Sequence, residues 1–111
     1  GEQSPAIYFN MLRLAFPNVI AIKLLDRLQN TTDYNAMSDA DWLLKYADET
    51  IEHVCPLIQI MVVNGANISG GYFTLGTWIE DRLMANLHGM RTRAYELKAL
   101  AEGQGEEDAS Q

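Results

Sequence analysis

Two stretches of this chain repeat apolar residues at the spacing of an α-helix, and no other feature constrains the fold as strongly. Over 39–63 and again over 72–101, such residues recur every three or four positions, the period of a helix that buries one stripe. The two stripes are Leu44, Ala47, Ile51, Val54, Ile58 and Met61, and then Leu75, Ile79, Leu83, Leu87, Met90, Ala94, Leu97 and Ala101. The sequence therefore predicts an all-α fold built on an antiparallel hairpin of two long helices.

The first long helix carries a start signal and an internal obstacle. Ser38 is placed to cap the free amides of its first turn, and Asp41 completes a capping box. Pro56 has no N–H for the carbonyl of Glu52, and its ring crowds the preceding turn. We therefore expect a kink or a break between Glu52 and Cys55.

Glycines mark the second long helix. Gly103 predicts its end. Gly76 and Gly89 lie inside it and weaken it, but small residues at these positions would let another helix approach closely. The dipeptide Asn64-Gly65 separates the two helices. The same dipeptide favours a β-hairpin turn, so a pair of strands across 57–75 is the alternative.

The first third of the chain predicts one or two shorter helices that pack on the hairpin. Its apolar residues at helical spacing are Ile7, Met11, Leu14, Ile20, Leu24 and Leu28. Phe16-Pro17-Asn18 divides this series, and Pro17 suits the first turn of a second helix. The polar stretch 30–37 is expected to be a loop.

Length and charge set further limits. A chain of 111 residues fits one small domain, and we expect a single helical domain over 1–101 and a flexible acidic tail over 102–111. The formal net charge is -7, but Glu2 and the four acids of the tail contribute most of it. An acidic chain argues against non-specific nucleic-acid binding and against docking on an anionic membrane.

The most apolar stretch, 6–25, contains Arg13 and Lys23, so we do not expect it to cross a membrane. No secretory signal is evident, and a cytoplasmic location is the expectation. The single cysteine, Cys55, cannot form a disulfide within the chain.

Charges of opposite sign concentrate in the two long helices. Over 33–52 there are six acids against Lys45, and over 82–98 there are four bases against Glu96. Helices charged in this way can lie antiparallel within one hairpin or pair across a dimer. Exposed ion pairs of this kind contribute less than about 1 kcal/mol each, so they orient the helices more than they stabilise them.

Few residues have the types and spacing that chemistry requires. Glu49 and His53 share a helix face, but a metal site would need further ligands, and only Cys55, His88 and scattered acids are available. Cys55 lies in an apolar run, which disfavours a reactive thiolate. We therefore predict no catalytic residue, no cofactor and no metal.

Aromatic residues are the remaining candidates for a site. We expect most of those near the helix starts to lie in the core, and any left exposed to anchor a protein partner, because Trp and Tyr dominate binding hot spots. The candidate partner-binding residues are Tyr8, Phe9, Trp42, Tyr72 and Trp78.

Two long amphipathic helices have more apolar face than one short N-terminal segment can cover, which predicts a homodimer, with a helical bundle at its centre. The leading hypothesis is a non-enzymatic protein-interaction module, regulatory or accessory, that binds itself and another protein. One alternative is an acidic mimic of nucleic acid that occupies the basic groove of an enzyme. Another is a small metal- or ligand-binding helical protein. The helical hairpin resembles those of short bacterial and phage-borne proteins, and this resemblance implies no activity.

Overall fold

The computed structural model describes residues 5–110, with side chains from 5 to 103, as a series of helices joined by short connections. In chain order these are α1 (Pro5–Leu12), α2 (Pro17–Asn30), the short 3-10 helix η1 (Tyr34–Ala36), α3 (Ala40–Glu49), the π-helix η2 (Thr50–Val54), α4 (Cys55–Gly65) and α5 (Gly71–Ser110). No strand occurs within residues 5–110. The all-α prediction is therefore confirmed, and the alternative of a β-hairpin across 57–75 is wrong.

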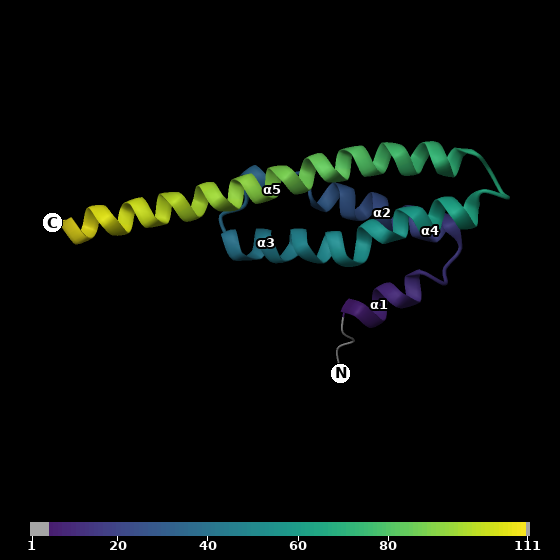
Figure 1. The fold of residues 1–111 in the computed structure, drawn as a ribbon, viewed down its shortest axis with the longest axis horizontal. Coiled ribbons are helices and arrows are strands. Elements are labelled where there is room, and N and C mark those ends of the chain that lie inside the picture. The colour runs from purple at the N-terminus through teal and green to yellow at the C-terminus, as the bar shows by residue number, and fades with distance from the viewer. Residues whose placement is uncertain (1–4, 111) are drawn as a thin grey trace.

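The helices from α2 to α5 pack as a bundle, α1 lies beside it as an arm, and the C-terminal end of α5 extends beyond the other helices (Figure 1). α3, η2 and α4 follow one another as a single bent rod that lies antiparallel to α5, as the apolar periodicity predicts. α2 packs against both α4 and α5 and runs in the same direction as α5, while α1 makes its contacts with η2. The N-terminal segment thus packs on the two-helix hairpin, as expected.

The core lies where α2, the bent rod and α5 meet. Leu24, Leu43, Met61 and Leu83 are all fully buried, and the predicted stripe of α5 is buried throughout its middle, from Ile79 to Ala94. The N-terminal stripe is different. Its last three members, on α2, are buried, but the first three, Ile7, Met11 and Leu14, are exposed. α1 buries Phe9 and Leu12 instead, so the predicted inward face of α1 is wrong.

The bent rod shows how the chain accommodates Pro56. The N–H of Cys55 donates to the carbonyl of Thr50, five residues earlier, so the turn before the proline is wider than an α-helical turn. This wider turn relieves the crowding caused by a ring that cannot donate to Glu52. The expected kink is therefore present as a π-helical segment, and the rod continues without a break.

Two helix ends differ from the predictions. Asp39, not Ser38, is the N-cap of α3, and its carboxylate accepts a hydrogen bond of 3.0 Å from the N–H of Trp42. Gly103 does not end α5, which continues to Ser110. A terminating glycine adopts a positive φ, and no glycine within the described residues does so. Side chains beyond 103 lie outside the described residues, so the predicted flexibility of 102–111 stays a prediction.

Of the two predicted close approaches of a helix to α5, the one at Gly76 is present. A Cβ at Gly76 would lie 2.7 Å from a methyl carbon of Val62, so the glycine lets α4 come close. At Gly89 the neighbour is the ring of Tyr34, from η1, rather than another helix. Both glycines thus lower the stability of the helix but allow a neighbouring side chain to pack closely against it.

The charged helices pair within one chain, in antiparallel register. Arg91 of α5 bonds Asp48 of α3 at 3.0 Å, and Lys98 approaches Asp41 at 3.2 Å. Arg93 donates to the carbonyl of Met37, just before α3. The expectation that these charges orient the two helices is therefore met inside the protomer.

Candidate functional site

α1 is apolar on every side and carries no charged residue. Such a helix belongs in a fully buried position, yet only one side of α1 is covered, by Phe9 and Leu12 packing on the body. Its other side leaves Ile7 and Met11 exposed. The arm is therefore half-covered by its own chain.

Exposed apolar residues also occur in the connection from α1 to α2 and on α2 itself. Leu14 is 89% exposed and Phe16 77% exposed in the connection, and Ile22 is 63% exposed on α2. We call the set the N-terminal apolar surface, made of Ile7, Met11, Leu14, Phe16, Val19 and Ile22. Exposed apolar residues that gather in one segment of a chain indicate a site of interaction, so this surface is the leading candidate site.

The charges beside this surface are all positive. Residues 5–25 contain Arg13 and Lys23 and no acid, although the whole chain has a net charge of -7. Neither cation pairs with a carboxylate among the described side chains. The surface thus lacks the acidic groups that cover most of the protein.

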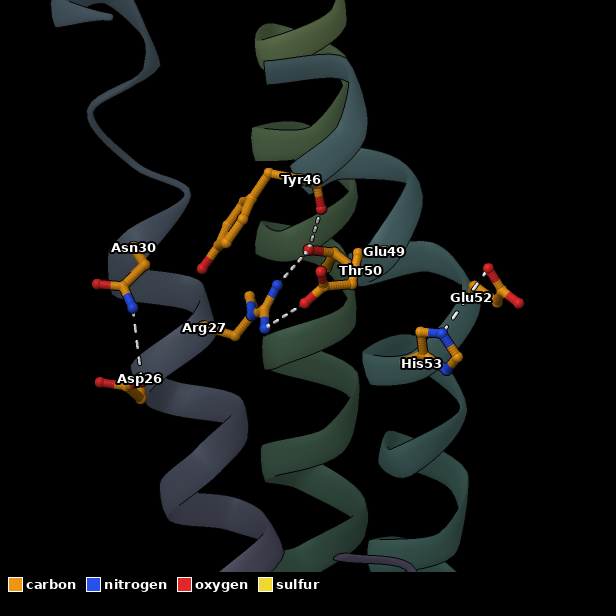
Figure 2. A network of polar contacts seen from close by, with 8 residues as sticks. All are labelled: Asp26, Arg27, Asn30, Tyr46, Glu49, Thr50, Glu52 and His53. Carbon is orange, nitrogen blue, oxygen red and sulfur yellow. Dashed lines mark hydrogen bonds and ion pairs between the residues drawn. The ribbon is translucent and has the colours of Figure 1, made fainter. Parts of the chain in front are cut away.

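A half-buried arginine joins α2 to the bent rod (Figure 2). Arg27 of α2 donates to Thr50 Oγ1 at 3.1 Å and to Glu49 Oε1 at 3.2 Å. Thr50 is fully buried and in turn donates to the carbonyl of Tyr46 at 2.7 Å. Arg27 therefore joins α2 to the bent rod at the point where α3 ends and the π-helical segment begins.

Aromatic rings extend from this arginine on both sides. The guanidinium carbon of Arg27 lies 4.3 Å from the ring centre of Tyr46 and 5.7 Å from that of Phe9. Tyr46 stacks on Trp42 at 4.8 Å, and Phe9 stacks on His53 at 5.3 Å. We call these five side chains the aromatic ladder. The aromatic ladder holds α1, α2 and α3 together, because each helix contributes at least one ring or the cation.

Three of the five predicted partner-binding residues lie in or beside the aromatic ladder, namely Phe9, Trp42 and Tyr8. Phe9 is buried, and its neighbour Tyr8 packs edge-on against it at 5.2 Å. Trp42 and Tyr8 keep part of their rings exposed. The other two lie elsewhere, since Tyr72 packs over Gly65 and Trp78 lines a groove between α2 and α5.

Most of the aromatic residues near helix starts are exposed, so the expectation that they form the core is wrong. Only Phe9 of that set is buried, whereas Phe16 and Phe73 are mostly exposed. Aliphatic residues at the three- and four-residue spacing fill the bundle instead. Most of the aromatic rings near the helix starts therefore lie at the surface.

The residues considered for chemistry have other roles. Glu49 pairs with Arg27, and His53 lies against Phe9, with Glu52 3.8 Å from its Nε2. Burial, and then the negative charge of Glu80, raise the pKa of the Cys55 thiol, which makes it a poor nucleophile. Within residues 5–103, no three His, Cys, Asp or Glu side chains gather as a metal-binding group.

The candidate surface was not among the predicted site residues, although the sequence contains a signal for it. α1 and the connection after it lack acids, and α2 has a second apolar row beside its buried one, which is Val19, Ile22 and Leu25. A helix with apolar residues on two faces needs two neighbours.

Comparison with protein-family models, curated proteins and solved structures finds no match for this chain. None of the helices within the described part of the chain combines the length and the apolarity needed to span a bilayer.

Proposed function

We propose that this chain is a non-enzymatic protein-interaction module that forms a homodimer through the N-terminal apolar surface. The observation that carries the proposal is the uncharged helix α1 and the connection after it, which leave Met11 and Leu14 exposed. Burying apolar area of this kind is the main favourable contribution to association.

A second copy is the partner that best fits this surface. The exposed apolar residues are not interrupted by acids, and homodimer interfaces are more apolar than those of transient complexes. An identical chain is present wherever the protein is present, so it can cover the patch continuously. In a two-fold arrangement the same patch serves both protomers, and Arg13 and Lys23 would lie at the rim.

The two alternative functions have less support. An acidic mimic needs rows of free carboxylates, whereas Asp41, Asp48 and Glu49 of α3 are paired with cations of the same chain. A metal-binding function would use Glu49 with histidines, and Glu49 is engaged by Arg27. We therefore place the function on the apolar surface.

Sedimentation equilibrium tests the proposal. We expect the wild-type chain to sediment with the mass of two protomers at tens of micromolar. The double variant Met11→Glu with Leu14→Glu should weaken association at least about a hundredfold, about 2.7 kcal/mol, because it places carboxylates in the centre of an apolar contact. Both positions are exposed, so protomer stability should change by less than about 0.5 kcal/mol per site.

Leu100→Glu is the matched control, because Leu100 is similarly exposed but lies on α5, away from the patch. This variant should remain dimeric. A wild-type chain that sediments as one protomer throughout the micromolar range would refute the homodimer, as would a double variant that associates as tightly as the wild type.

A further inference from the structure

A groove of about 490 Å³ lies between α2 and α5. It begins at Leu25, one turn after Ile22, and none of the six residues of the N-terminal apolar surface lines it. Leu25 and Gln29 line it from α2, and Trp78, Arg82 and Asn86 line it from α5. Its volume falls in the range of natural binding pockets. The groove is therefore large enough to hold one or two side chains of a partner.

The floor of the groove is fixed by hydrogen bonds. Asn86 Nδ2 donates to Thr31 Oγ1 at 3.1 Å and to the carbonyl of Leu28 at 3.3 Å. Thr31 is buried and donates to the carbonyl of Leu28 at 2.9 Å. α2 and α5 are thus held at a constant spacing beneath the groove, so the site is formed before anything binds.

The walls pair an apolar surface with one cation. The guanidinium carbon of Arg82 lies 4.3 Å from the ring centre of Trp78, and both side chains are exposed. Stacking holds the guanidinium in place while its N–H groups remain directed outward in its plane. Trp and Arg are the residue types that contribute most to binding hot spots.

Arg82 is the single charged residue among those that line the groove. It pairs with no carboxylate among the described side chains, whereas Arg27, Arg91 and Lys98 each do so. The nearest acids in the sequence, Asp26, Glu80 and Asp81, are exposed but do not line the groove. An occupant that matches this charge carries a carboxylate.

We propose that the α2–α5 groove binds a short acidic amphipathic helix of a second protein. An apolar side chain of that helix packs against Trp78 and Leu25, and a neighbouring carboxylate accepts hydrogen bonds from Arg82. Trp78 and Asn86 are separated by about 12 Å along α5, which matches two turns of a bound helix. The inference rests on the proposed role as an interaction module, but it does not depend on dimerisation.

The test uses a fixed probe and the full chain. The probe is an amidated helical peptide with leucines on one face and glutamates beside them, and its control peptide has glutamine at each glutamate. Binding is followed through the indole N–H signals of Trp78 and Trp42 in two-dimensional NMR spectra, assigned with Trp42→Phe. We expect the Trp78 signal to shift, the Trp42 signal to stay, and the glutamine peptide to bind at least tenfold more weakly.

The matched variants are Arg82→Gln and Arg13→Gln, because both arginines are exposed and only Arg82 lines the groove. Arg82→Gln should weaken binding of the glutamate peptide at least tenfold, and Arg13→Gln should leave the affinity for this peptide unchanged. The proposal is overturned if no binding occurs at millimolar peptide, if both peptides bind equally, or if the Arg13 variant has the larger effect.

A second copy in the groove would also overturn it. In that case the Trp78 signal would move when the protein is diluted without peptide. The double variant Met11→Glu with Leu14→Glu separates the two proposals, because it should abolish dimerisation and still bind the glutamate peptide with wild-type affinity.

Discussion

The α3–α5 pair and the α1–α2 segment are both rich in apolar residues, but they arrange them in opposite ways. α5 turns one stripe inward, and its cations meet the acids of α3 on the outside. α1 and α2 have apolar residues on two sides and no acid between residues 5 and 25. The position of the charges, more than the amount of apolar surface, thus distinguishes two regions. We call the α3–α5 pair the complete region and the α1–α2 segment, which leaves one apolar side exposed, the incomplete region.

The largest effect should come from the core of the complete region. Leu83→Ala removes a fully buried side chain from α5, and we expect unfolding in urea to show a loss of about 2–5 kcal/mol. Its neighbour Met84 is 44% exposed, so Met84→Ala should cost less than about 0.5 kcal/mol. Equal costs at the two positions would remove the distinction between an inner and an outer face of α5.

The junction between the two regions should give an intermediate effect. Arg27→Ala leaves Glu49 half-buried without its partner and removes the contacts with Thr50 and Tyr46. We expect a loss of about 2 kcal/mol in urea unfolding. Arg91→Ala breaks a more exposed pair with Asp48 and should cost less than about 1 kcal/mol. A larger loss of stability for Arg91→Ala than for Arg27→Ala would mean that the exposed ion pairs stabilise the bundle more than the contacts of Arg27 do.

The smallest effect concerns the thiol at the start of α4. Burial disfavours the Cys55 thiolate and Glu80 repels it, so its pKa should lie above the ordinary 9.0. Fewer thiolates then form at a given pH, and alkylation should reach half its maximal rate above pH 9.0. Glu80→Gln removes the repulsion and should move this midpoint down. A midpoint below 9.0 would show that the interior of the bundle is open to water at this point.

The sequence predicts the complete region better than the incomplete one, for a physical reason. In α5 the predicted stripe is the buried face from Ile79 to Ala94, so periodicity identifies both the helix and its inward face. In the bent rod periodicity identifies the helix but misplaces part of its inward face, because Leu43 is fully buried and Ile51 is 37% exposed. In α1 nearly every position is apolar, and periodicity cannot decide between the face of Phe9 and that of Met11. That choice depends on where Phe9 meets Arg27 and His53, which are distant in the sequence.

Smaller errors have similar origins. Ser38 and Asp39 are both good caps, and the sequence alone does not decide which of them begins α3. The groove could not be predicted because Leu25 and Trp78 become neighbours only after the bundle forms. Pro56, by contrast, acts on the turn directly before it, and its effect was predictable from local chemistry.

Photo-crosslinking from Leu14 tests whether the N-terminal apolar surface joins two copies of the chain. Leu14 is replaced by p-benzoylphenylalanine, and Leu100 is replaced in the same way as a control. We expect a covalent dimer from position 14 on irradiation of the purified chain at micromolar concentration, with none from position 100. Equal crosslinking from both positions, or none from position 14, would contradict it.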